Sequence, residues 1–120
     1  MANEITARAA LLITKNGIQS ANDFTEQSDL TGNAFFSNVQ TIGISAEPVF
    51  FGDLGSANIA LFQNLDPANY VELALDVPAT AQVFVKLNPK AVAIIPLKTL
   101  AIYAKANAAA VNLFVQAVEV

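Results

Sequence analysis

The sequence predicts an all-β protein, an antiparallel, jelly-roll-like β-sandwich. Two observations predict this fold class. Apolar and polar residues alternate with a period of two along most of the chain, which is typical of half-buried strands. Turn-forming residues return about every 8 to 12 positions, which gives about eight to ten short strands. At 120 residues, the chain is expected to form a single domain over residues 1–120, with its ends as candidate interaction arms.

The first part of the chain predicts two strands joined by a tight turn. Alternate apolar residues form one face of the first strand: Ile5, Ala7, Ala9, Leu11 and Ile13. Lys15-Asn16-Gly17 follows as a turn, because Asn-Gly adopts positive φ at little cost. Residues 18–30 are predicted to form a more polar second strand, which ends at Thr31-Gly32-Asn33.

The middle of the chain alternates strands with polar corners. Aromatic and β-branched residues predict strands over residues 34–42, 48–51, 59–63 and 70–76, with a loop at residues 52–55. Asn64-Leu65-Asp66-Pro67 is predicted to be a turn, because Asn and Asp bond neighbouring backbone amides and proline ends a strand ladder. A further turn is expected at residues 77–80.

The last third predicts four more strands, over residues 83–87, 91–95, 100–105 and 111–117. The final segment also suits a helical stripe, through Val111, Phe114, Val115 and Val118. Its β-branched content favours a strand. Because it is apolar on both faces, it is also a candidate arm that would add a strand to a neighbour's sheet.

The composition holds more apolar area than a chain of this size can hide. Hydrophobic residues make up 54% of the chain and charged residues 13%, against about 25% charged residues in an ordinary domain. The mean hydropathy is +0.47. Exposed apolar patches are therefore expected, and such patches mark association surfaces. No run approaches the about 20 apolar residues of a membrane span, and the start lacks the pattern of a secretory signal.

The residue types exclude most reaction chemistry, so we expect no enzyme, no catalytic residue, no cofactor and no metal. Histidine and cysteine are absent, which removes the commonest general base and metal ligands. Asp66, Glu72 and Asp76 cluster in the sequence, but Glu72 and Asp76 would lie about 13 Å apart on one strand face. That is wider than the about 5 to 10 Å of paired glycosidase carboxylates.

The charge of the chain is unevenly distributed. Residues 1–80 hold nine acids against Arg8 and Lys15, a balance of −7, whereas residues 81–120 hold four lysines against Glu119, a balance of +3. The two sum to the net charge of −4, which argues against broad binding to nucleic acid or anionic membranes. Two explanations fit this distribution: the charges lie on solvated faces, or they match opposite charges on neighbouring subunits.

Paired phenylalanines are the candidate anchors of a subunit interface. Adjacent rings in Phe35-Phe36 and Phe50-Phe51 point to opposite sides of a strand, so one ring of each pair is expected to face away from the core. Aromatic side chains often anchor protein interfaces. The predicted interface residues are Phe35, Phe36, Phe50, Phe51, Phe114, Val118 and Val120.

Several turn and strand motifs resemble those of a group of small tailed-bacteriophage proteins. They are GDLGSANIALFQNLDPANYVELALD in the middle of the chain, the Leu87-Asn88-Pro89-Lys90 step, and TLAIYAKANAAAVNLFVQAVEV at the end. The resemblance covers nearly the whole chain. It implies a virion structural protein, most plausibly a cement or decoration protein of the capsid.

The expected function is therefore structural. The chain would self-associate on the outer capsid surface of a virion and stabilise contacts between major capsid protein subunits, with itself and the major capsid protein as partners. A neck or tail component is the first alternative. A carbohydrate- or receptor-binding β-sandwich module is the second, although such sites favour exposed Trp or Tyr, and the chain holds no Trp and only Tyr70 and Tyr103.

Overall fold

The computed structural model describes residues 4–28, 35–55, 59–75 and 82–119, and within them the chain is all-β. Ten strands lie in these ranges, and no helix does. They are β1 (Ile5–Lys15), β2 (Ile18–Ser28), β3 (Phe35–Ile42), β4 (Glu47–Pro48), β5 (Ile59–Asn64), β6 (Val71–Leu75), β7 (Gln82–Leu87), β8 (Val92–Pro96), β9 (Ile102–Ala106) and β10 (Val111–Val118).

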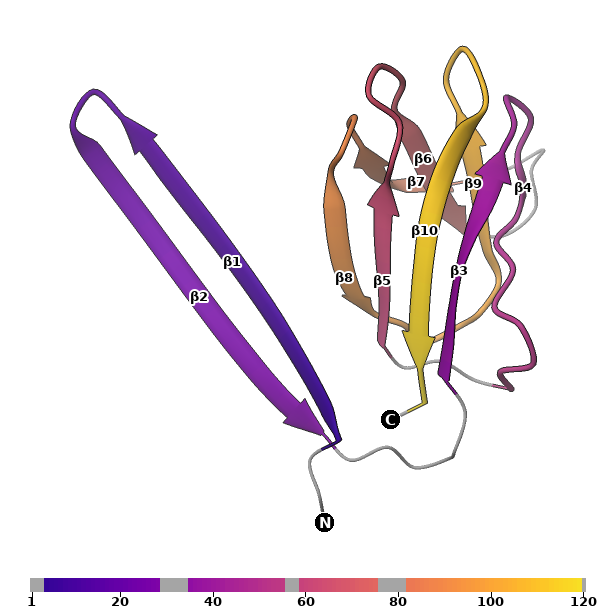
Figure 1. Cartoon of the computed structure of the whole chain (residues 1–120), viewed down its shortest axis with the longest axis horizontal. Helices are drawn as coiled ribbons and strands as arrows, with labels where there is room; N and C mark the ends of the chain where they lie inside the picture. The colour runs from indigo at the N-terminus through magenta and orange to yellow at the C-terminus, as the bar shows by residue number, and fades with distance from the viewer. Residues whose placement is uncertain (1–3, 29–34, 56–58, 76–81, 120) are drawn as a thin grey trace.

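The strands form three antiparallel sheets (Figure 1). We call β1–β2 the hairpin, the sheet of order β3-β10-β5-β8 sheet I, and the sheet of order β4-β9-β6-β7 sheet II. Every pairing between the described strands is antiparallel. The predicted all-β, antiparallel fold class is therefore confirmed.

Sheets I and II share one hydrophobic core. Sheet I contributes Ile42, Phe62 and Leu113 to a single cluster of buried side chains, and sheet II contributes Leu73 and Ile102. The period-two pattern of the sequence produces this arrangement, because alternate residues of each strand point to the same face. In β5 and β10 the inward residues are buried and the residues between them are more exposed.

The C-terminal segment is a central strand and not an arm. β10 pairs with β3 on one side and with β5 on the other. Its inward residues Val111, Leu113, Val115 and Ala117 are at most 1% exposed. The preference for a strand over a helix is confirmed, and the expectation of a C-terminal arm is wrong, because this strand supplies part of the chain's own core.

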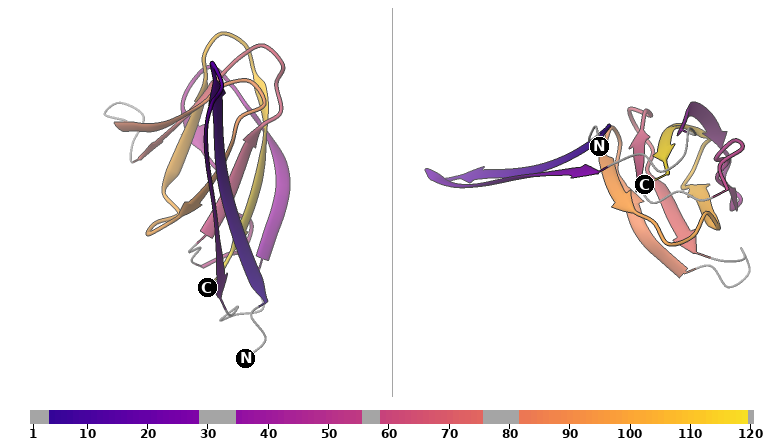
Figure 2. Two further views of the ribbon diagram at one scale, coloured as in Figure 1. Left: turned by 90° about the vertical axis from the view of Figure 1, so that its left-hand side faces the viewer. Right: turned by 90° about the horizontal axis from the view of Figure 1, so that it is seen from below.

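At the other end of the chain, the hairpin stands off the rest of the molecule (Figures 1 and 2). Its turn follows the prediction: Asn16 and Gly17 have φ values of 52° and 80°, the geometry of a two-residue hairpin turn. The radius of gyration is 15.5 Å, above the about 14 Å of a compact chain of this length. The first predicted strand is not half-buried along its length, because only Ile5 and Ala7 are partly covered.

Other differences from the predicted elements are local. The strand expected over residues 48–51 is reduced to Glu47–Pro48, although the Val49 amide still donates to the Ile102 carbonyl at 2.8 Å. The turns expected at residues 31–33 and 77–80 lie outside the described residues.

The polar corner between β5 and β6 is organised by the fully buried side chain of Asn64. Its Nδ2 donates to the Asn69 carbonyl at 2.8 Å and to the Leu87 carbonyl at 3.0 Å. Its Oδ1 accepts from the Asp66 amide at 2.9 Å. One side chain thus ties the corner to the end of β7, as expected for a buried polar group that must satisfy its hydrogen bonds.

Asp66 caps the same corner. Its carboxylate accepts from the Ala68 amide at 2.9 Å and from the Asn69 amide at 2.6 Å. These two backbone hydrogen bonds hold the pKa of the Asp66 carboxyl below its usual range, because they favour the charged form.

We predict that Asn64→Ala lowers the free energy of unfolding by about 2 to 3 kcal/mol, because it leaves buried backbone groups without partners. The control is Asn22→Ala in the exposed part of the hairpin, which should change it by less than about 0.5 kcal/mol. Urea unfolding followed by circular dichroism measures both. Equal effects of the two substitutions would contradict the role assigned to Asn64.

We predict that Asp66→Asn reduces the loss of stability at acid pH. A carboxyl with a lowered folded-state pKa contributes its full stabilisation above its unfolded pKa, which is about 3.9, and loses it as the pH falls through the folded value. The wild type should therefore lose more unfolding free energy than the variant between about pH 6 and about pH 2. Urea unfolding at both pH values provides the measurement, and parallel losses would count against the prediction.

Candidate functional site: an uncharged sheet face and an apolar hairpin

The four strands of sheet I contain no charged residue. Asp, Glu, Lys and Arg are all absent from Phe35–Ile42, Ile59–Asn64, Val92–Pro96 and Val111–Val118. Paired residues lie on the same side of a sheet, so the register defines the side turned away from the core. We call this side the sheet I face. It consists of Phe35, Ser37, Val39, Thr41, Ile59, Leu61, Gln63, Val92, Ile94, Pro96, Asn112, Phe114, Gln116 and Val118.

The sheet I face is an apolar surface with open positions at its margins. Phe35 is 69% exposed and Val39 is 45% exposed, both on the edge strand β3. Val92 is exposed on the opposite edge strand, β8. An uncharged face with exposed aromatic and β-branched side chains has the character of an interaction surface rather than of a solvated one.

The outer side of sheet II has the opposite character. Glu72 lies opposite Lys86 on one neighbouring strand and opposite Lys105 on the other. The Lys86 Nζ also lies 4.3 Å from the centre of the Tyr70 ring. Alternating charges of this kind suit contact with water, so the two sheets differ sharply in what their outer sides can contact.

The hairpin has one apolar and one polar face. Its register places Ile5, Ala7, Ala9, Leu11, Ile13 and Phe24 on one side, which we call the hairpin apolar face. Leu11 is 66% exposed and Phe24 is 72% exposed. On the other side Arg8 and Asp23 form an ion pair at 2.6 Å, whose hydrogen bond lowers the pKa of the Asp23 carboxyl.

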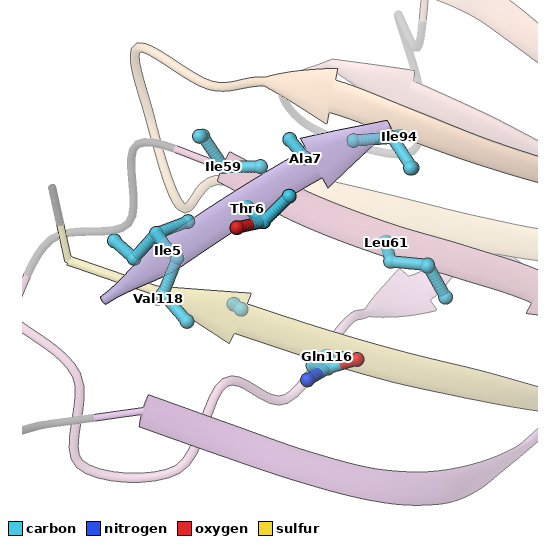
Figure 3. A pocket seen from close by; sticks show the side chains of 9 residues that line it. Ile5, Thr6, Ala7, Ile59, Leu61, Ile94, Gln116 and Val118 are labelled. Carbon is cyan, nitrogen blue, oxygen red and sulfur yellow. The ribbon is translucent and has the colours of Figure 1, made fainter. Parts of the chain in front are cut away.

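The base of the hairpin rests on the sheet I face. Ile5 and Ala7 are partly covered, whereas Thr6 between them is exposed, so the hairpin apolar face is the side turned toward the body. This part of β1 and the sheet residues Ile59, Leu61, Ile94 and Val118 line one shared pocket (Figure 3). The two apolar surfaces therefore lie on either side of one pocket within one molecule.

The predicted interface residues separate into four groups, one of which faces the interior. Phe35, Phe114 and Val118 all belong to the sheet I face, with the last two partly covered. Phe50 is exposed elsewhere, next to the end of β4, and Val120 lies outside the described residues.

Phe51 and Phe36 face the interior. Phe51 is only 5% exposed and contacts Phe62 edge-on, with 6.3 Å between ring centres, so its assignment to the interface is wrong. Phe36 is partly buried against the core and meets Phe50 edge-on at 5.5 Å. Each pair thus divides into an inner and an outer ring, as the strand geometry predicted.

The sequence predicted an apolar side for the first strand, but it did not predict that this side stays exposed at Leu11, Ile13 and Phe24. Their alternation is the same as in a core strand, so nothing local shows that no second layer covers them. The charge-free character of sheet I was present in the sequence as four uncharged strands, and it could have been recognised there.

Reaction chemistry has little support in the part of the chain that the structure describes. No group of three or more His, Cys, Asp or Glu side chains lies together in those residues. Asp66 is engaged by backbone amides, Glu72 faces two lysines, and Asp76 lies outside the described ranges. The described residues also include no helix long and apolar enough to cross a membrane.

Comparison of the chain with protein-family models, with curated protein sequences and with solved structures found no match. The proposed function therefore depends on the geometry of these surfaces and on the motif resemblance.

We predict that Gly52→Ala destabilises the protein more than Gly17→Ala. Both glycines have positive φ, 64° and 80°, so alanine is strained at each. A Cβ at Gly52 would also lie 2.5 Å from the Phe36 ring, whereas a Cβ at Gly17 would meet no atom within 4 Å. Thermal unfolding should show the larger shift for Gly52→Ala, and an equal shift would contradict the close packing of Phe36 on Gly52.

Proposed function

We propose that this protein is a non-enzymatic structural component of a tailed-bacteriophage virion, which self-associates on the outer capsid surface and braces contacts between major capsid protein subunits. The observation that carries the proposal is the uncharged sheet I face beside a bare apolar hairpin. Covering surfaces of this composition is favourable by about 25 cal/mol per Å² of buried apolar area, before the costs of association are subtracted.

The proposed fold is a jelly-roll sandwich of sheets I and II. The chain passes between the two sheets at every step from β3 to β10 except the step from β6 to β7. Strand orders of β3-β10-β5-β8 and β4-β9-β6-β7 fit two interlocked Greek keys over eight strands. The shared core between the sheets supports the same fold. Jelly rolls recur in viral capsid proteins, which agrees with the proposed role without establishing it.

The motif resemblance supports the virion assignment at particular positions. Asn64 and Asp66 of the Asn-Leu-Asp motif form the hydrogen-bonded corner before β6. Tyr103-Ala104-Lys105 of the Tyr-Ala-Lys-Ala motif lies within β9. These motifs hold the fold together, so they support a family of similar architecture more directly than a particular location in the particle.

A neck or tail component would use the same surfaces, and it remains the first alternative. A carbohydrate- or receptor-binding module has weaker support. Tyr70 and Tyr103 are both partly covered, and Tyr70 already has Lys86 over its ring.

The capsid proposal is tested with expanded capsids of the encoding phage, assembled without this protein. The wild-type chain should co-sediment with them at a fixed ratio and raise the temperature at which they disrupt. Capsids that already carry the protein are the control and should take up no more.

Three outcomes would contradict the capsid assignment. They are failure to co-sediment, location of the protein at the neck or tail in a cryo-EM map of the particle, and specific retention on a glycan array. The second outcome would favour a neck or tail component, and the third a receptor-binding module.

A further inference from the structure

We propose that the hairpin of one copy packs with its apolar face against the sheet I face of a second copy of this chain. This proposal deepens the self-association within the proposed function and rests on it. In the contact by which copies bind, one subunit donates an arm and the next subunit presents an uncharged sheet.

The first step is that the two surfaces are complementary to each other. Within one molecule, Ile5 and Ala7 of the hairpin apolar face line the same pocket as Ile59 and Ile94 of the sheet I face (Figure 3). The same pair of surfaces can therefore form the same kind of contact between two molecules.

The second step is that most of each surface remains open. Leu11, Ile13 and Phe24 belong to the hairpin apolar face, and all three are exposed. The hairpin stands off the body, so these residues are not covered by the sheet of their own molecule (Figures 1 and 2). On the sheet, Phe35 and Val39 are likewise uncovered.

The third step is electrostatic. The sheet I face carries no charged residue, as described above. From Ala9 to Ile13 and from Ser20 to Phe24, the residues on the hairpin apolar face are also uncharged, because Asp23 points to the other side with Arg8. This central stretch can therefore meet the sheet I face without burying an unpaired charge, whereas Lys15 near the turn and Glu26 near the base lie on the same side at its two ends.

The fourth step is size. Each hairpin strand has 11 residues, as β1 and β2 both show. The part of the hairpin beyond its base, Arg8 to Lys15, is about 26 Å long and about 10 Å wide, so one arm contact buries about 500 Å² counted over both partners. That is below the about 1,600 Å² of a standard interface.

Where two copies exchange arms, the two contacts lie in one interface of about 1,000 Å², which reaches the lower limit expected of a specific interface. An arm-to-sheet contact joins two different surfaces, so repeating it either closes a ring or grows a filament. The size estimate favours an assembly in which each arm and each sheet is used.

The first test compares two adjacent leucines on opposite faces of the hairpin, Leu11→Asp and Leu12→Asp. Leu12 is 61% exposed, close to Leu11, but it lies on the polar face. Sedimentation velocity over a concentration series should show a self-association about 10- to 100-fold weaker for Leu11→Asp, the loss expected for one buried leucine. Leu12→Asp should associate as the wild type does.

The second test uses the sheet, with Val39→Asp on sheet I and Val83→Asp on sheet II as its control. Both valines are exposed and lie on edge strands. Val39→Asp should dissociate the assembly and Val83→Asp should not. Circular dichroism verifies that every variant is folded.

The third test mixes the two dissociated variants, Leu11→Asp and Val39→Asp. The intact arm of the second can still bind the intact sheet of the first, so the mixture at high micromolar concentration should contain a dimer, held by one arm contact, that neither variant forms alone. Absence of this dimer would overturn the arm-on-sheet contact, and so would a wild-type chain that stays monomeric at high micromolar concentration.

Equal effects of Leu11→Asp and Leu12→Asp would likewise overturn the contact. These results are independent of the capsid assignment. A chain that binds capsids but fails the mixing test keeps the proposed virion role and loses the arm contact. A chain that passes the mixing test but does not bind capsids keeps the arm contact and loses the virion role.

Discussion

Sheet I is apolar on both of its sides, and the other features of the molecule follow from this constraint. Its inner side, with Phe62, Leu113 and Val115, is covered by sheet II. Its outer side is also uncharged, and hairpin residues line pockets with it near Ile59, Ile94 and Pro96. A sheet that is hydrophobic on both sides has the composition of a sheet with a covering layer on each side. A single chain of this size supplies only one full covering layer.

Several polar side chains of the described residues hold the chain in place through hydrogen bonds to the backbone. The buried amide of Asn64 joins the β5–β6 corner to the end of β7, and Asp66 uses its carboxylate on neighbouring amides. Glu72 is set between two lysines on the outer side of sheet II. Charged residues thus lie at this corner, on the outer side of sheet II and on the hairpin, whereas the strands of sheet I contain none.

Much of the fold could be predicted from local pattern. Asn16-Gly17 specified the hairpin turn, and the alternation of residues 111–117 specified a strand in spite of its alanine content. The candidate surface was predicted only in part. Phe35, Phe114 and Val118 lie together on the sheet I face, but Phe51 belongs to the core, because its neighbour Phe50 takes the outward position. Which ring of an adjacent pair turns inward depends on the layer across from it.

What the sequence by itself determined is the fold class, the turns and the excess of apolar strands over one core, because periodicity, Asn-Gly chemistry and composition are local properties. Only the tertiary structure decided which apolar faces stay open. Ile13 and Val115 occupy equivalent alternating patterns, yet one is bare on the hairpin and the other is 1% exposed in the core. The physical reason is that burial depends on a second layer, and that layer comes from strands distant in the sequence.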